Sequence, residues 1–234
     1  MAAPSRTVAI AARPASLEID LGRSAVLVID MQNDFGSPGG MFDRIGIDLS
    51  VIRQAVPPTQ RVVAAARAAG IPIVYLKMAH RPDLSDTGGQ DSPHWFRHEP
   101  MAVGEAVTAP DGQPSRILIE GTWNTDVLPE LAPHPGDIVV SKHRYSGFFE
   151  TDLDDQLCAL GARNLIVTGC TTSVCVESTI RDAMFRDYVC LLLEDCTGQP
   201  PFPNAPFGTH EASLLTIQAM FGWVSDSASL IAAL

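Results

Sequence analysis

The sequence predicts an α/β fold: a single doubly wound domain whose mostly parallel sheet carries helices on both faces. Short apolar runs alternate with helical patterns along the chain, which is typical of a parallel sheet covered on both sides. The 234 residues, 46% of them apolar and 18% charged, are enough for one buried core and include no low-complexity block. We expect this domain to span residues 21–234, after a frayed N-terminal tail over residues 1–20.

The first half of the domain contains two strands and a helix between them. Residues 25–29 are aliphatic and mostly β-branched, and Asp30 stands at the end of this predicted strand. Pro57 and its neighbour can open a helix whose apolar positions continue to Gly70. Residues 71–76 then form the second predicted strand, with a proline tolerated at its start.

The second half repeats the alternation. Residues 138–140 form a third strand that ends near Lys142, and Thr151 can cap a helix over residues 152–160. Residues 165–168 form the fourth strand. A helix that contains Cys175 follows, then a fifth strand over residues 189–193 and a last helix over residues 212–220.

Two stretches fit no regular element. Residues 78–122 are rich in Pro, Gly, His and Asp, and residues 199–208 are dense in proline. Long irregular segments of compact domains are usually functional or disordered. Aromatic side chains in and next to these stretches favour ordered covers over a pocket; these are Trp95, Phe96, Trp123 and Phe207.

Charge and cysteine content limit the classes of partner and compartment. The net charge of −11 argues against nucleic acid and anionic membranes, and no apolar run reaches the roughly 20 residues that a membrane span needs. The cysteine count is odd, which fits reduced thiols in a cytoplasmic enzyme better than a disulfide framework. The five cysteines are Cys158, Cys170, Cys175, Cys190 and Cys196.

Cys175 lies in the most informative motif of the chain, residues 169–178. The predicted strand 165–168 runs into a glycine turn and then into a cysteine at the start of a helix. A helix start offers unpaired N–H groups and the positive end of the dipole, which favour a thiolate and can hold an oxyanion. The motif therefore predicts a cysteine hydrolase.

Asp30 and Lys142 can complete the chemistry of Cys175. A carboxylate at a strand end can take the thiol proton and return it to a leaving nitrogen, and a lysine beside both groups lowers the pKa of the thiol. Considered singly, Asp30 suits the role of a turn carboxylate, Lys142 that of a solvated surface lysine and Cys175 that of an inert buried thiol. All three follow strand ends, however, and such ends of a parallel sheet share one edge, so we favour a catalytic triad.

Three motifs in the same order resemble the isochorismatase-like cysteine hydrolases, from about Arg23 to Leu234. They are residues 28–35, residues 142–148 together with Thr151, and residues 169–179 followed by Arg181 and Asp182. The resemblance implies a triad of Asp30, Lys142 and Cys175 in a doubly wound fold. It also implies a cis peptide between Cys170 and Thr171 and an oxyanion hole made by the backbone N–H groups of Thr171 and Cys175.

Within this family the chain looks most like two groups of enzymes. Ureidoacrylate amidohydrolases share the patterns of residues 37–40, 121–123, 144–149 and 221–226, and biuret hydrolases share those of residues 80–84 and 191–196. Both resemblances imply hydrolysis of a small ureido or carbamoyl compound through a covalent thioester-type intermediate, without a cofactor, in a homo-oligomer.

Other functions stay open at this stage. The substrate can be another small amide, such as an N-carbamoyl amino acid, a maleamate-like acid or nicotinamide. The chain can also be a catalytically silent scaffold, or a redox protein with Cys170 as the resolving thiol. An intact triad speaks against the last two, because they would leave Asp30 and Lys142 without a role.

The remaining expectations concern metal and substrate contacts. Nicotinamidase-type relatives hold a metal with an aspartate and two histidines after the second strand. His80, His94 and His98 lie in that segment with a different spacing, so we expect scattered histidines and no metal. Three residues next to matching motifs are candidates for binding the ureido group: Trp123, Tyr145 and Gln218.

Overall fold

A computed structural model describes residues 6–202 and 208–234. Among these residues the main sheet has six strands in the order β10-β9-β8-β3-β4-β7, and every neighbouring pair is parallel. The strands are β3 (Ser24–Ile29), β4 (Ile73–Met78), β7 (Ile138–Lys142), β8 (Asn164–Cys170), β9 (Val189–Gly198) and β10 (Trp223–Ser225). The predicted fold class and its five strands are confirmed.

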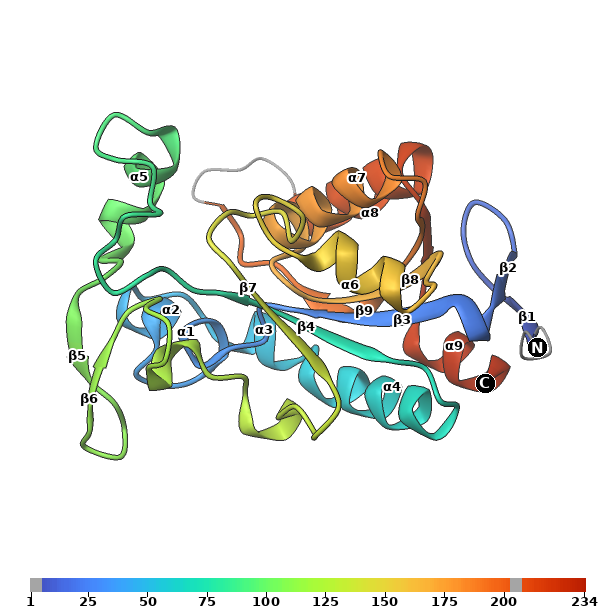
Figure 1. Cartoon of the computed structure of the whole chain (residues 1–234), viewed down its shortest axis with the longest axis horizontal. Helices are drawn as coiled ribbons and strands as arrows, with labels where there is room; N and C mark the ends of the chain where they lie inside the picture. Colours follow the sequence, from blue (N-terminus) through green and yellow to red (C-terminus); the bar gives the residue numbers. More distant parts are fainter. Residues whose placement is uncertain (1–5, 203–207) are drawn as a thin grey trace.

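Helices cover both faces of this sheet (Figure 1). On one face α6 (Leu153–Ala159), α7 (Glu177–Met184) and α8 (Thr209–Met220) bury apolar side chains such as Leu157, Ile180 and Ile217. On the other, α4 (Val56–Ala68) and α9 (Ser227–Ala233) pack through Val62 and Leu230. The sheet thus separates two hydrophobic clusters, as its almost wholly apolar strands require.

The chain order of the strands reverses between β3 and β8. From β3 the chain continues outward to β4 and β7, and from β8 it continues the other way to β9 and β10. Open α/β sheets bind ligands at such a reversal, outside the carboxyl ends of the strands. The fold alone therefore directs attention to the residues that follow β3 and β8.

The N-terminal segment corrects one expectation. Residues 6–20 are not a frayed tail, because β1 (Thr7–Ile10) and β2 (Leu17–Asp20) form an antiparallel hairpin. Ile10 is fully buried and Arg13 bridges to Val224 in β10, so the hairpin joins the core beside the edge strand. β10 and α9, which follow the last predicted helix, also belong to the main body.

The long irregular segment is ordered and contains short elements. They are α5 (Pro93–His98) and the hairpin of β5 (Ala106–Thr108) and β6 (Pro114–Arg116). After β3, three more short helices lead to α4: α1 (Asn33–Gly36), α2 (Met41–Arg44) and α3 (Ser50–Arg53). Both groups lie at the carboxyl edge of the sheet (Figure 1), so they are placed to wall a site there.

Candidate active site

Asp30, Lys142 and Cys175 come from three different strand ends and meet at one place. Asp30 follows β3, Lys142 ends β7, and Cys175 lies just after β8. The Lys142 Nζ atom is 2.7 Å from Asp30 Oδ2, and the two residues have no exposed surface. Both groups act on the thiol of Cys175: the Lys142 ammonium lowers its pKa and the Asp30 carboxylate raises it. The sheet thus brings together three residues that are far apart in the sequence.

The electrostatics of the three groups are those of a buried relay. Burial raises the pKa of Asp30, and the Lys142 ammonium opposes this shift. Burial by itself lowers the pKa of Lys142, but Asp30 and Cys175 together outweigh it and hold that pKa above its usual value. Burial also raises the pKa of the Cys175 thiol. The resting thiol is therefore protonated, contrary to the thiolate expected from a helix start.

The backbone around Asp30 and Gly169 explains how these side chains approach so closely. Gly169 has φ of 120°, and a Cβ atom there would lie 2.1 Å from the carbonyl oxygen of Ile29, so only glycine fits. Asp30 has φ of 52°, a left-handed conformation that is uncommon for a non-glycine residue. Its N–H is fixed by the carbonyl oxygen of Leu76, 2.9 Å away. The turn after β3 is thus held in one conformation.

Cys175 lies within a π-helical turn, Thr172–Val176, and α7 begins only afterwards. The expectation that an α-helix starts at this cysteine is corrected in that respect. Single π-helical turns are rare in proteins as a whole, but those that occur often lie at functional sites. Gln199 fixes the turn, because its Oε1 accepts hydrogen bonds from the N–H and hydroxyl of Ser173 at 2.9 and 2.8 Å.

The peptide bond between Cys170 and Thr171 is cis, as the resemblance implies. The carbonyl oxygen of Thr171 accepts hydrogen bonds from the N–H groups of Val174 and Val176 at 3.1 and 3.2 Å. These bonds turn the chain around Cys175. Thr171 and Cys175, the two residues expected to supply the oxyanion hole, both border the same cavity.

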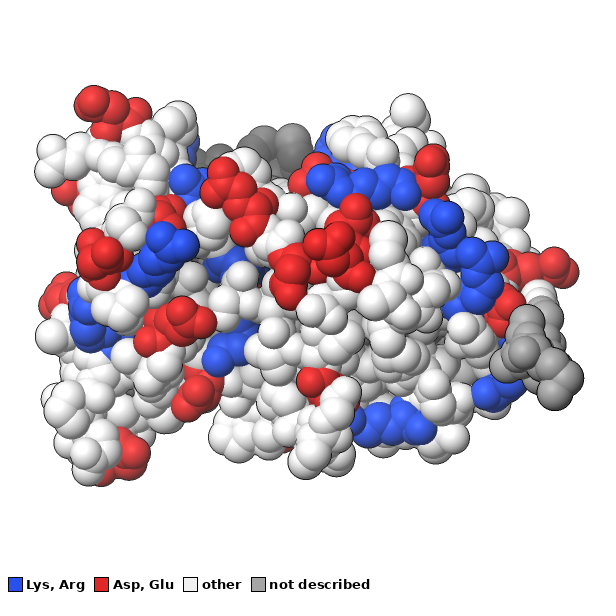
Figure 2. Space-filling model, viewed as in Figure 1, with Lys and Arg blue, Asp and Glu red and all other residues white. Residues whose placement is uncertain are grey.

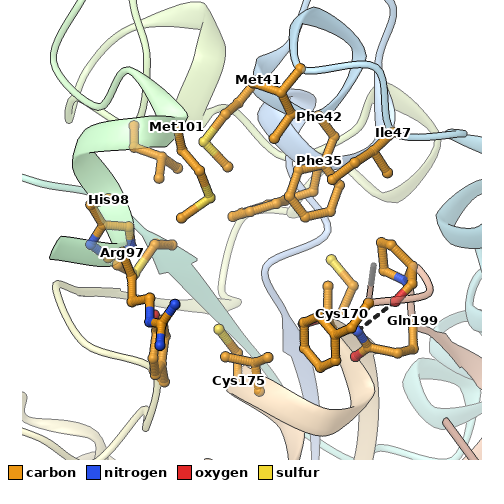
Figure 3. A pocket seen from close by; sticks show the side chains of 18 of the residues that line it. Phe35, Met41, Phe42, Ile47, Arg97, His98, Met101, Cys170, Cys175 and Gln199 are labelled. Atoms are coloured by element: carbon orange, nitrogen blue, oxygen red, sulfur yellow. Dashed lines mark hydrogen bonds between the residues drawn. The ribbon is translucent and has the colours of Figure 1, made fainter. Parts of the chain in front are cut away.

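That cavity has a volume of about 450 Å³ and is mostly apolar (Figure 3). Arg97 and His98 lie on one side, Cys170 and Gln199 on the other, with Cys175 at the floor. The remaining wall comes from helices after β3 and from the irregular segment, and includes Phe35, Met41, Phe42, Ile47, Met101 and Leu118. A small planar substrate can therefore reach Cys175 in surroundings that contain little water.

Buried amides and a carboxylate hold this wall in place, a role that the sequence did not reveal. Gln32 donates to the carbonyl oxygens of Met78 and Thr125, both at 3.0 Å. Asp34 accepts from the N–H groups of Met41 and Leu118 at 2.8 and 2.7 Å. Burial raises the pKa of Asp34 to about 6. These bonds tie the helices after β3 to the irregular segment.

The three expected substrate contacts differ in position. Tyr145 borders the cavity. Trp123 lies outside the described lining, and its carbonyl oxygen accepts a hydrogen bond from the Asn33 side chain at 2.8 Å. Gln218 also lies outside the described lining, and its Oε1 accepts a hydrogen bond from Arg13 Nε at 3.1 Å. Of the three, Tyr145 alone is in the described lining, and the roles of Trp123 and Gln218 in substrate binding stay predictions.

The aromatic covers expected over the pocket are also placed elsewhere. Phe96 is 64% exposed, and neither it nor Trp95 borders the cavity. Phe207 falls outside the described residues. The second proline-dense segment instead contributes Pro200, Pro201 and Phe202 to the lining.

The histidines after β4 are gathered rather than scattered, which corrects the expectation from their spacing. His80, His94 and His98 are buried, and one ring nitrogen of each lies within 4.8 Å of those of the others. The missed signal is the four-residue spacing of His94 and His98, which puts both on one face of α5. Burial lowers the pKa of each of these two rings to about 3, so both are neutral.

Comparison with known proteins identifies the family. A family model described as the isochorismatase domain matches residues 24–229. The chain belongs to the isochorismatase family. It is 40% identical to ureidoacrylate amidohydrolase RutB of Methylobacterium radiotolerans, over 97% of this chain and 85% of that protein. The corresponding protein of Methylorubrum extorquens is 41% identical over 97% of this chain and 89% of its own.

Solved structures of the isochorismatase family agree with the fold. A cysteine hydrolase from Pseudomonas syringae pv. phaseolicola superposes with a TM-score of 0.76 at 33% identity, covering 92% of this chain and 93% of its own. An N-carbamoylsarcosine amidase from Thermoplasma acidophilum gives a TM-score of 0.63 at 26% identity, covering 88% of this chain and 96% of its own. The family and fold expected from the sequence are confirmed.

The surface of the molecule indicates which kinds of partner it can bind. On the face shown in Figure 2, acidic and basic side chains are interspersed and form no continuous basic area. Within residues 6–202 and 208–234, no helix is long and apolar enough to cross a membrane. The cavity above Cys175 is concave and mostly apolar, which suits a small molecule.

Proposed function

We propose that this hydrolase is an amidohydrolase that cleaves a C–N bond of a small ureido or carbamoyl compound, with Cys175 as nucleophile. The observation that carries the proposal is the meeting of Asp30, Lys142 and Cys175 at the floor of an apolar cavity. A nucleophile, a base in contact with it and a third charged group that orients the base are the parts that covalent catalysis requires.

The first half of the reaction uses the raised pKa of Asp30. The carboxylate takes the proton of Cys175, and the thiolate adds to the ureido carbonyl carbon. The carbonyl oxygen becomes an oxyanion, which the backbone N–H groups of Thr171 and Cys175 stabilise. Asp30 then gives the proton to the leaving nitrogen, the C–N bond breaks and the carbamoyl group stays on the sulfur as a thioester-type intermediate.

The second half returns the enzyme to its starting state. Asp30, again a carboxylate, takes a proton from a water molecule, and the resulting hydroxide adds to the carbonyl carbon of the intermediate. The C–S bond breaks, the thiolate of Cys175 takes the proton back from Asp30, and the product leaves as carbamic acid, which loses its proton to solvent and becomes carbamate. Lys142 keeps a positive charge beside both groups throughout, because its pKa is held above the usual value by Asp30.

Ureidoacrylate is the first substrate to test, because the relatives with 40% and 41% identity are ureidoacrylate amidohydrolases. The cavity favours a second candidate as well. About 450 Å³ of mostly apolar space leaves room for a group larger than an acrylate, such as the side chain of an N-carbamoyl amino acid. Arg97, at the side of the cavity, can pair with the carboxylate that either substrate carries.

The test is ammonia release, since carbamate decomposes to ammonia and carbon dioxide, from ureidoacrylate, biuret, N-carbamoyl amino acids, maleamate and nicotinamide. Wild type is compared with Cys175→Ser and with Cys158→Ser, which removes an exposed thiol. We expect release from a ureido compound by wild type and Cys158→Ser, and none from Cys175→Ser. Equal rates for Cys175→Ser and wild type would refute the proposal, and cysteine-dependent release only from maleamate or nicotinamide would refute the ureido substrate class.

A further inference from the structure

The three buried histidines after β4 form a cluster that the proposed reaction does not use. His80 is fixed at the end of β4, where its N–H donates to the carbonyl oxygen of Leu118 at 2.7 Å and its own carbonyl oxygen accepts from the N–H of Glu120 at 2.9 Å. His94 and His98 lie four residues apart on α5, with ring centroids 3.9 Å from each other. Two independent elements thus direct three imidazoles to one point.

One nitrogen on each ring has no hydrogen-bond partner among the described residues. These atoms are Nε2 of His80, Nε2 of His94 and Nδ1 of His98, and all three are buried. Buried polar atoms are almost always paired, because an unpaired one costs about 1–3 kcal/mol. Three such atoms on three neighbouring rings therefore indicate that something binds in this cluster.

Asp86 fixes the chemical state of one ring. Its Oδ1 atom is 3.1 Å from His80 Nδ1, so the carboxylate accepts a hydrogen bond from Nδ1–H and leaves Nε2 with a free lone pair. A histidine that binds a metal almost always donates its other N–H to a carboxylate or carbonyl group in this way. The arrangement at His80 is therefore that of a metal ligand with its supporting carboxylate.

The distances also suit a metal ion. Zinc binds imidazole nitrogens at about 2.0–2.1 Å with tetrahedral geometry, which puts the nitrogens about 3.4 Å from each other. In this cluster one ring nitrogen of each histidine lies within 4.8 Å of those of the other two. Each ring then has to move inward by less than about 1 Å, a shift that small side-chain rotations supply.

From these observations we infer that His80, His94 and His98 bind one divalent transition-metal ion of the zinc type. Three imidazoles suit zinc, iron, nickel and copper rather than magnesium or calcium, which prefer oxygen ligands. A tetrahedral ion with three protein ligands keeps one open position. Because His98 also borders the cavity above Cys175, the ion lies in the wall of the candidate active site.

The charges around the cluster permit a cation. Asp86 brings a negative charge to His80, and the Lys142 ammonium is paired with Asp30 at 2.7 Å. The Arg144 guanidinium donates to the backbone carbonyl oxygens of Asp86 and His143 at 2.6 and 2.8 Å, which disperses its charge. Tyr145 packs edge-on against His94 and His98 and adds no charge.

The experiment measures metal binding and not activity. Full-length protein carrying Cys175→Ser and Cys158→Ser, so that neither thiol competes for metal, is stripped with a chelator and titrated with Zn²⁺ by calorimetry and with Co²⁺ by visible absorption. We expect one ion per chain and Co²⁺ spectra without a thiolate charge-transfer band. Asp86→Asn should weaken binding about 10–100-fold. His134→Ala, which removes an exposed histidine, should leave binding unchanged.

The variant that removes the site is His94→Leu together with His98→Leu, and its fold is checked by circular dichroism. Binding that survives in this variant would overturn the inference. A folded parent that binds no ion at any metal concentration tested would overturn it too, and would leave a water molecule as the occupant. If the double variant does not fold, the loss of affinity in Asp86→Asn, compared with unchanged affinity in His134→Ala, still decides the question.

Discussion

Two clusters of buried polar side chains lie beside the same cavity, and they are stabilised in opposite ways. Asp30 and Lys142 form an ion pair within the chain, with Lys142 Nζ 2.7 Å from Asp30 Oδ2. His80, His94 and His98 are equally secluded, yet each has a ring nitrogen without a partner among the described residues. The first cluster contains two opposite charges that pair with each other, and the second contains three neutral rings for which we infer a bound cation.

This difference predicts how the removal of one residue from each cluster changes the stability of the protein. Removing one partner of a buried ion pair leaves an isolated charge, which is costly. A neutral ring whose inward nitrogen binds nothing can be replaced by an apolar side chain of similar size at little cost. The stability of metal-free variants therefore separates the two clusters.

Lys142→Met should break the first cluster most severely. It leaves the Asp30 carboxyl buried and unpaired, so we expect the free energy of unfolding to fall by about 3–5 kcal/mol. Urea denaturation measures this.

Lys77→Met is the matched control, because Lys77 lies on β4 and its Nζ is 4.0 Å from the exposed Asp126, a pair worth about 1 kcal/mol or less. Adding Asp30→Asn to Lys142→Met should restore part of the loss. Equal costs for the two lysines would contradict the buried ion pair.

Asp34 is a third kind of buried group, a carboxylate held by N–H donors without a cation. Its pKa of about 6 in the folded protein exceeds the usual 3.8, so the unfolded chain loses this proton first as the pH rises. Ionisation of Asp34 should therefore lower stability between about pH 4 and pH 6, by up to about 3 kcal/mol. Urea denaturation across this range should show the fall in wild type and a smaller one in Asp34→Asn. Identical pH profiles would contradict the assignment.

His98→Leu sharpens the contrast from the other side. In metal-free protein this variant should change the free energy of unfolding by no more than about 1 kcal/mol, because the inward nitrogen of His98 has no hydrogen bond to lose. Added Zn²⁺ should raise the melting temperature of wild type and not that of the variant. A loss as large as that of Lys142→Met would show that His98 is tied into the protein by bonds of its own.

Gln218→Ala should have the smallest effect on catalysis. Its side chain bonds Arg13 and lies outside the described lining of the cavity. We expect kcat/KM to stay within about 2-fold of wild type, in line with the roughly 0.5 kcal/mol of substitutions away from a site. A steady-state assay with the best ureido substrate measures this. A selective rise in KM would restore Gln218 as a substrate contact.

The sequence predicted the part of the site that regular structure determines. Each strand that leads to Asp30, Lys142 or Cys175 is a continuous apolar run, and the parallel arrangement puts the ends of such runs at one edge. The local conformation of Cys175 was harder to predict, because a π-helical turn and an α-helix start share one sequence pattern.

The histidine cluster was missed because it depends on an irregular segment. α5 has six residues, and nothing in its composition indicates that it folds back beside the end of β4. The N-terminal hairpin was missed for a similar reason, because strands of four residues show too little alternation to be recognised. In both cases tertiary contacts, and not local sequence pattern, determine the structure.

The most direct test of the central claim is to trap the carbamoyl group on the enzyme. Wild-type protein mixed with the best ureido substrate is quenched in acid within the first turnover, digested and analysed by mass spectrometry. We expect a carbamoyl adduct on the peptide that contains Cys175. The adduct should be absent in Cys175→Ser and present in Cys158→Ser. Substrate turnover without any adduct at Cys175 would contradict covalent catalysis by this residue.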